Sequence, residues 1–93
     1  MDEPVARRAT VRIINKKGLH ARASAKLVEA AARFQCQILV VKDGQKVDAR
    51  SIMGLMMLAA SMGSEVEIEA DGIDADEAMV AILALVEAKF GED

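Results

Sequence analysis

This chain of 93 residues has very few of the residues that form disulfides, metal clusters or stacking surfaces for nucleic-acid bases. It contains one cysteine, one histidine and two Phe, with no Trp or Tyr. A single cysteine excludes an internal disulfide and any multi-cysteine metal site. Cys36 lies beside an apolar run, so we expect it to pack as a small hydrophobic residue. Phe34 and Phe90 are the only aromatic residues, which are too few to form a surface that stacks on nucleic-acid bases. We also expect no metal and no cofactor.

The chain also lacks an excess of positive charge and a long apolar run. Its 12 Lys and Arg are outnumbered by 15 Asp and Glu, which gives a net charge of −3. A general nucleic-acid binder would need a basic face. No apolar run is long enough to span a bilayer, and the first eight residues lack the apolar core of a signal peptide. We therefore expect a cytoplasmic protein with neither nucleic-acid binding nor membrane insertion.

The length and the 53% hydrophobic content predict one domain. We expect a mobile tail over residues 1–8 and a single domain over residues 9–93. Periodicity and turn signals then predict the element order β-α-β-β-α-β-α. The expected strands cover residues 10–14, 36–42, 45–49 and 65–70, and the expected helices run from about 21 to 34, from 52 to 60 and from 74 or 76 to 90. This order predicts an α+β two-layer sandwich with a mostly antiparallel sheet, helices on one face and water on the other.

Individual residues mark several of the predicted boundaries. Asp43-Gly44 is a strong signal for a type I′ hairpin turn. Ser51 suits the N-cap of the second helix, and Gly63 suits its C-terminal end. Asp74 or Asp76 can cap the final helix.

The segment Gly18-Leu19-His20-Ala21-Arg22 is the most informative one in the chain. It places the only histidine where a loop meets a predicted helix. A helix N-terminus offers unpaired N–H groups and the positive end of the helix dipole, which suit a phosphate. An imidazole there can receive a phosphoryl group, and the guanidinium of Arg22 can bind its oxygens. Alternatively, His20 is a partly exposed bystander, as a lone histidine more commonly is.

The second informative segment begins at Ser51 and is apolar on nearly every side. Because a short surface helix cannot bury every side, some of Ile52, Met53, Leu55 and Met56 should be exposed beside the His20 site. Such a patch marks a surface on which partners dock, and flexible methionines suit several different partners. The alternative is that methionines at helical spacing fill the core.

Together, Asn15–Ala25 and Ser51–Leu58 resemble two motifs of the HPr family, the histidine-containing phosphocarrier proteins of the bacterial phosphoenolpyruvate-dependent phosphotransferase system. The resemblance covers nearly all of the chain after residue 8. It implies an open-faced β-sandwich in which three helices cover four antiparallel strands. It also implies that Enzyme I, charged by phosphoenolpyruvate, phosphorylates His20 on Nδ1, and that His20 passes the group to an EIIA domain. Arg22 matches the active-site arginine of the family. A monomeric carrier without turnover of its own is expected.

Three features leave alternatives within the family. Many members have proline after the active-site arginine, and this chain has Ala23, so the start of the first helix is not fixed by the sequence. Ser51 matches a serine that HPr kinase/phosphorylase phosphorylates in some bacteria, although capping explains this serine equally well. The run from His20 to Leu27 and the C-terminal helix look more like nitrogen-type carriers than sugar-uptake carriers, which favours a regulatory role.

Two other classes of protein can be weighed against a phosphocarrier. An acylphosphatase-like hydrolase could use the same order of strands and helices, but no obvious residue that positions water accompanies Gly18–Arg22. A binding module without phosphoryl chemistry is the second alternative. It would incorporate no label from phosphoenolpyruvate and Enzyme I.

Overall fold

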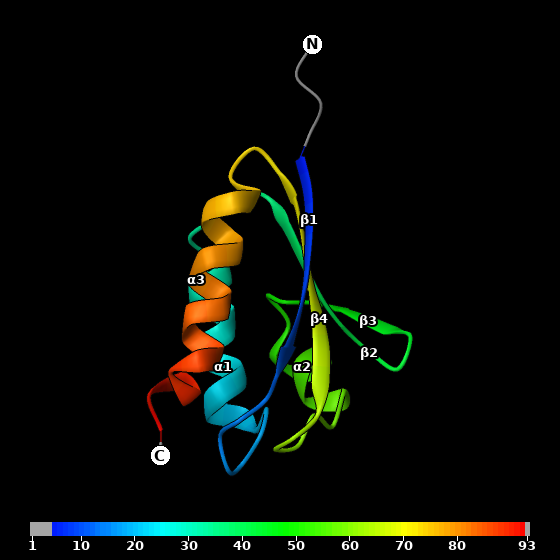
Figure 1. The fold of residues 1–93 in the computed structure, drawn as a ribbon, viewed down its shortest axis with the longest axis vertical. Helices are drawn as coiled ribbons and strands as arrows, with labels where there is room; N and C mark the ends of the chain where they lie inside the picture. Colours follow the sequence, from blue (N-terminus) through cyan, green and yellow to red (C-terminus); the bar gives the residue numbers. More distant parts are fainter. Residues whose placement is uncertain (1–4, 93) are drawn as a thin grey trace.

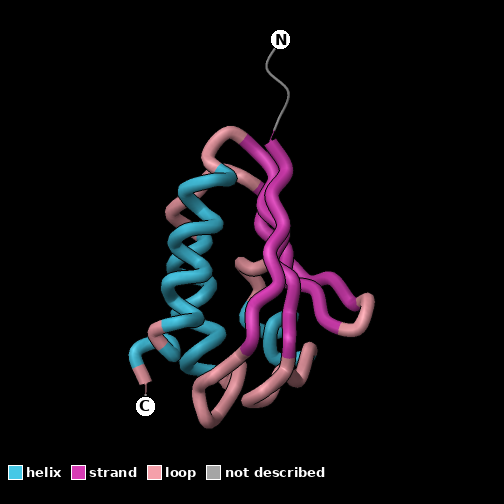
Figure 2. The backbone as a smooth tube through the Cα atoms, in the orientation of Figure 1, coloured by secondary structure: helices cyan, strands magenta, loops and turns pink. Residues whose placement is uncertain are grey.

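The computed structural model describes residues 5–92, which form one four-stranded sheet with helices packed on one face (Figures 1 and 2). The elements are β1 (Val5–Arg12), α1 (Ala21–Ala31), β2 (Gln37–Lys42), β3 (Gln45–Asp48), α2 (Ile52–Met57), β4 (Glu65–Gly72), α3 (Ala75–Glu87) and a short 3₁₀ helix η1 (Lys89–Gly91). The predicted α+β class and element order are confirmed.

The strands are all antiparallel and lie in the order β1-β4-β2-β3. Asp43 and Gly44 join β2 to β3, and their φ angles of 52° and 80° are both positive, as a type I′ turn requires. The predicted hairpin is therefore confirmed.

The first strand begins earlier than the sequence predicts. Residues 5–8 belong to β1 and pair with β4, from Val5 opposite Gly72 to Arg8 opposite Glu69. The predicted mobile tail is therefore wrong for these four residues, and its residues 1–4 lie outside the described part of the chain. Local periodicity could not show this extension, because β4, which is distant in sequence, supplies the pairing.

The core lies between the sheet and the helix layer, where α1 and α3 run side by side (Figure 1). Leu55 and Leu58 bring the short α2 into the same core, and α2 contacts α1 and β3. Alternation along β4 turns Val66, Ile68 and Ala70 into the core. The buried set also contains Cys36, as predicted. The largest fully buried side chains are those of Phe90, Ile13, Leu27, Ile38, Leu55, Ile68 and Ile82.

All three helices end earlier than predicted, and the first stops at Ala31 and not at residue 34. The second helix stops at Met57 and not at residue 60, because Ala59 takes a left-handed φ of 53°. Gly63 lies in the turn before β4, where its N–H donates to the carbonyl of Ile13 at 2.7 Å. The final helix stops at Glu87 and not at residue 90, and Phe90 enters the core from a left-handed backbone with φ 55°.

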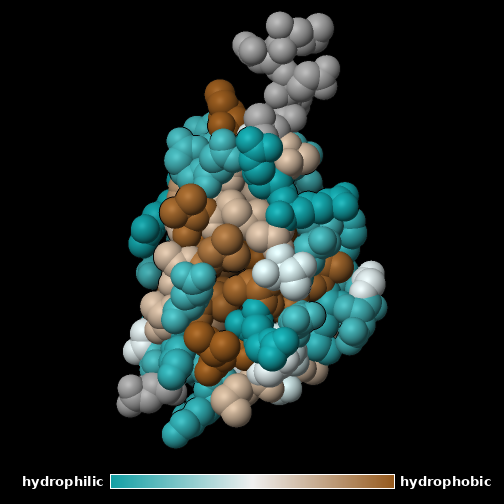
Figure 3. All heavy atoms as spheres, viewed as in Figure 1, coloured by the Kyte–Doolittle hydropathy of each residue, from teal (hydrophilic) through white to brown (hydrophobic). Residues whose placement is uncertain are grey.

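The outer side of α3 is also rich in apolar residues. Figure 3 shows apolar side chains gathered over α3 and the neighbouring surface toward β1. Val80, on this helix, is exposed, while Met79 and Ile82 are buried beneath it. None of the helices within residues 5–92 combines the length and apolar character needed to cross a membrane.

Candidate functional site

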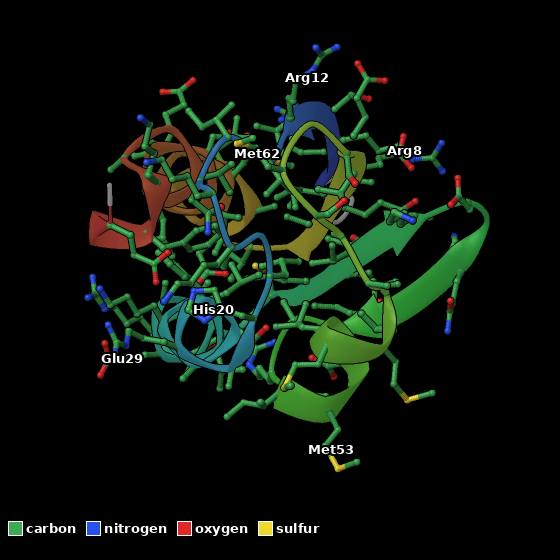
Figure 4. All side chains as sticks on the ribbon, turned by 90° about the horizontal axis from the view of Figure 1, so that it is seen from below. Arg8, Arg12, His20, Glu29, Met53 and Met62 are labelled. Carbon is green, nitrogen blue, oxygen red and sulfur yellow. The ribbon has the colours of Figure 1, made fainter. Side chains whose placement is uncertain are left out.

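The two informative sequence segments lie at the same end of the molecule. The loop after β1, the start of α1, helix α2 and the C-terminal segment gather at the lower end of Figures 1 and 2. Figure 4 looks onto this end, with His20 at the beginning of α1 and Met53 pointing away from the body of the protein. A partner that covers this end could therefore contact both segments.

His20 is the N-cap residue of α1, with an extended backbone (φ −77°, ψ −176°). Its carbonyl accepts the first helical hydrogen bond, from the N–H of Ser24 at 2.8 Å. The amides of Ala21, Arg22 and Ala23 precede that bond, so they face the helix N-terminus without a helical acceptor. The first helix thus begins at Ala21, and Ala23 is buried in its first turn.

Gly18 allows the histidine loop to approach the segment that follows α2. Its φ is +64°, and a Cβ at this position would lie 2.4 Å from the carbonyl oxygen of Ala60. The neighbouring N–H of Leu19 donates to that same oxygen at 2.9 Å. A side chain at Gly18 would separate the two segments, so the contact requires glycine here.

The imidazole of His20 is held by a carboxylate from the end of the chain. Its Nε2 lies 2.7 Å from Oε2 of Glu92, and Nδ2 of Asn15 donates to Oε1 of the same carboxylate at 3.1 Å. Because an ionised carboxylate only accepts hydrogen bonds, the geometry assigns the ring proton to Nε2. In the neutral ring, Nδ1 then keeps its lone pair.

Glu92 remains ionised despite its partial burial. Burial raises the pKa of this carboxyl. Hydrogen bonds from Asn15 and His20 and the positive charge of Arg22 lower the pKa by more, so it lies below the ordinary value of a glutamate. A charged acceptor therefore faces Nε2 of His20 at neutral pH.

A cationic surface pocket adjoins this carboxylate. Its volume is about 360 Å³, and it is lined by Lys16, Lys17, Arg22, Lys26, Gly91 and Glu92. Four of these six residues carry positive charge, so the pocket suits a phosphoryl group or an acidic side chain. Arg22 lines this pocket beside Glu92, where its guanidinium can bind an incoming anion.

Ser51 caps α2, as its sequence position predicts. Its Oγ accepts a hydrogen bond from the N–H of Gly54 at 3.0 Å. A Cβ added at Gly54 would lie 3.1 Å from this Oγ and from Cβ of Val47, so glycine fits the tight space beside the cap.

The apolar face of α2 is exposed only in part. Ile52, Met53 and Met56 are 40%, 74% and 44% exposed, whereas Leu55 is completely buried. The prediction that Leu55 belongs to a docking face is therefore wrong, because this side chain packs into the core. Met57, the last residue of α2, and Met62 in the segment after it are also exposed.

The sequence reading gave no role to Glu92, and it quoted Asn15 only as part of a motif. Glu92 lies 72 residues after the histidine that it contacts. A glutamate near a chain end is normally solvated, and no local spacing links it to His20. Only the path of the folded chain identifies this contact.

Comparison with known proteins finds similar phosphocarrier proteins. The family model described as "PTS HPr component phosphorylation site" matches residues 7–88. The phosphocarrier protein HPr of Cupriavidus necator is 59% identical over 80 residues, which cover 86% of this chain and 90% of that protein. The phosphocarrier protein NPr of Shewanella violacea is 48% identical over 82 residues, covering 88% and 90%. The crystal structure of HPr from Thermoanaerobacter tengcongensis has a TM-score of 0.90 and 48% identity, and the match covers 94% of this chain and 98% of that one.

Proposed function

Because the chain belongs to the HPr phosphocarrier family of the bacterial phosphotransferase system, we propose that His20 accepts a phosphoryl group on Nδ1 from phospho-Enzyme I. The group then passes to an EIIA domain. In each transfer, the attacking lone pair forms a new bond to phosphorus, and the bond to the donor breaks with its electrons left on the donor. The protein acts as a carrier and has no turnover of its own.

One observation carries this proposal: the hydrogen bond from Nε2 of His20 to Glu92, at 2.7 Å. It leaves Nδ1 as the nucleophilic nitrogen, at the N-terminus of α1. The amides of Ala21, Arg22 and Ala23 and the pocket cations can bind the phosphoryl oxygens there. Electrostatic stabilisation of these oxygens is the main contribution that a protein makes to phosphoryl transfer.

The test is phosphorylation by purified Enzyme I and labelled phosphoenolpyruvate. The wild-type chain should incorporate one label that is acid-labile and base-stable, as a phosphohistidine is, and should release no phosphate in steady turnover. His20→Ala should remain folded and incorporate none. Labelling of a folded His20→Ala protein at the wild-type rate would contradict the proposal, and steady phosphate release would favour a hydrolase.

The exposed face of α2, formed by Ile52, Met53 and Met56, serves in this proposal as the surface on which Enzyme I and EIIA dock. Its position at the same end as His20 supports that role. Ser51 begins this face, so phosphorylation by an HPr kinase/phosphorylase would place charge beside it. Transfer assays with a sugar-specific and a nitrogen-type EIIA would distinguish the branches, since the relatives carry both names. The regulatory branch, the cytoplasmic location and the monomeric state stay predictions.

A further inference from the structure

The C-terminal segment returns to the phosphorylation site and presents Glu92 to the far side of the His20 ring. The two side chains are 26% and 16% exposed, and Nε2 and Oε2 are 2.7 Å apart. We propose that Glu92 is a positioning residue that keeps the proton on Nε2 during both the arrival and the departure of the phosphoryl group. This inference rests on the proposed function and assigns a role to a residue outside the two motifs.

The segment that carries Glu92 is firmly anchored. Lys89, Phe90 and Gly91 all have left-handed φ angles, of 57°, 55° and 76°. Such angles are unfavourable for non-glycine residues, but here the Phe90 side chain is completely buried. The carbonyl of Phe90 also accepts a hydrogen bond from Nζ of Lys26 on α1, at 2.6 Å. This anchored turn sets the position of Glu92 relative to α1.

Both oxygens of the Glu92 carboxylate have partners. While Oε2 faces His20, Oε1 accepts a hydrogen bond from Asn15. Asn15 is completely buried, and its Nδ2 also donates to the carbonyl of Gly18 at 2.8 Å. The carboxylate is thus held at both ends between the loop that precedes α1 and the imidazole.

The charges around Glu92 favour its ionised form. Lys16, Lys17, Arg22 and Lys26 line the pocket beside it, and His20 and Asn15 donate to it directly. No second carboxylate lines this pocket within the described residues. The acceptor for the Nε2 proton is therefore an anion at neutral pH, and a hydrogen bond to an anion is stronger than one to a neutral group.

This arrangement has a direct consequence for the departing phosphoryl group. When Nδ1 bonds to phosphorus and Nε2 keeps its proton, the ring is a cation that the carboxylate of Glu92 stabilises. When an acceptor lone pair attacks phosphorus, the Nδ1–P bond breaks and its electrons return to a neutral imidazole. If Nε2 had lost its proton, the same step would have to expel an imidazolate, which is a much poorer leaving group. Glu92 therefore favours transfer onward at neutral pH.

The test compares wild type with Glu92→Gln, which keeps a hydrogen-bond acceptor but loses the charge. Glu87→Gln is the matched control, because Glu87 is an exposed carboxylate on α3. The ring nitrogens of the unphosphorylated proteins are followed by NMR at neutral pH, where their shifts report which nitrogen carries the proton. Wild type and Glu87→Gln should carry it on Nε2, which faces Glu92, whereas Glu92→Gln should show a larger share of the tautomer protonated on Nδ1. For the transfer measurements, His20 is phosphorylated with phosphoramidate, which needs no protein donor.

The rate of transfer to EIIA supplies the second readout. Phosphorylated Glu92→Gln should transfer roughly 3–10-fold more slowly than wild type, as the loss of a hydrogen bond to a charged group predicts, while Glu87→Gln should transfer like wild type. A merely structural defect would slow transfer and leave the ring tautomer unchanged. The same tautomer in wild type and Glu92→Gln would overturn the inference. Failure of Enzyme I to label wild type would instead overturn the proposed function and leave the tautomer result standing.

Discussion

The N–H of Leu19 donates to the carbonyl of Ala60 at 2.9 Å, and this backbone bond, with those of Ile13 to Gly63 and Ser64, joins the loop after β1 to the segment that follows α2. These bonds hold His20, the proposed phosphoryl acceptor, and the exposed face of α2 at one end of the molecule (Figure 4). A partner that docks on α2 is thereby positioned to reach His20. Substitutions on α2 should therefore weaken the binding of a partner without changing the residues that carry out phosphoryl transfer.

Met53 and Leu55 test this relationship, because they lie two residues apart and differ completely in exposure. Met53→Ala should change the free energy of unfolding by less than about 0.5 kcal/mol, because 74% of the side chain is exposed. It should raise the KM for phosphorylation by Enzyme I several-fold. Leu55→Ala should lose about 2–5 kcal/mol of stability, because it leaves a cavity in the core. Urea unfolding and transfer kinetics measure both effects, with Val80→Ala on α3 as an exposed control. An unchanged KM for Met53→Ala would exclude this face as a docking surface.

Arg22 should act through the geometry of its guanidinium as well as its charge. Lysine keeps the charge but lacks the planar fork of donors that matches phosphoryl oxygens. Arg22→Lys should therefore transfer phosphate more slowly than wild type and faster than Arg22→Ala. Single-turnover kinetics with phospho-Enzyme I measure these rates. Arg33→Ala removes an exposed arginine beyond the other end of α1, and it should transfer like wild type. Identical rates for all the Arg22 variants would remove this residue from the mechanism.

Much of the fold could be predicted because its signals are local. The alternation in β4, the Asp43-Gly44 turn and the Ser51 cap each depend on a few neighbouring residues, and all three are confirmed. The predictions are wrong where contacts between residues distant in sequence decide the structure. Residues 5–8 become strand because β4 lies beside them, and Leu55 is buried because α2 packs against the core.

The candidate site shows the same division. His20 and Arg22 could be found because a lone histidine at a helix start has a local signature. Glu92 could not, because its contact with His20 depends on three left-handed residues at the end of the chain and on the burial of Phe90. No sequence spacing encodes that path.

The carboxylate of Asp74 should make the stability of the fold depend on pH. Its carboxylate accepts hydrogen bonds from the N–H groups of Gln35 and Cys36, at 2.8 and 2.9 Å. The Gln35 bond is the main cause that lowers the pKa of Asp74, with further help from Cys36 and against some desolvation. A lowered folded-state pKa means that the stabilisation is complete above the ordinary carboxyl pKa and is lost as pH falls below it. Asp74→Asn should therefore destabilise at pH 7, and its deficit relative to wild type should shrink toward pH 3.

Urea midpoints at both pH values measure this deficit, and Asp71→Asn, an exposed neighbour on β4, is the control. A deficit that is the same at pH 3 and pH 7 would mean that the charge of Asp74 contributes nothing. Cys36 gives an independent check, since burial and, to a lesser extent, Asp74 raise the pKa of its thiol to about 11. The native thiol should thus resist alkylation at pH 8 and react when the protein is unfolded.

Substitutions of Ser51 distinguish a role in capping α2 from a role in regulation. Ser51→Ala removes the acceptor for the N–H of Gly54, so it should cost about 0.5–2 kcal/mol of stability. Aspartate caps helices as well as serine does, so Ser51→Asp should retain wild-type stability. Its charge lies where α2 begins, next to the exposed Ile52 and Met53, and must be desolvated when a partner covers them, which is costly. Ser51→Asp should therefore raise the KM for Enzyme I, while Gln37→Glu on β2, with the same change in charge, should not. If Ser51→Asp loses stability and keeps its KM, the serine is only a cap and the regulatory hypothesis is wrong.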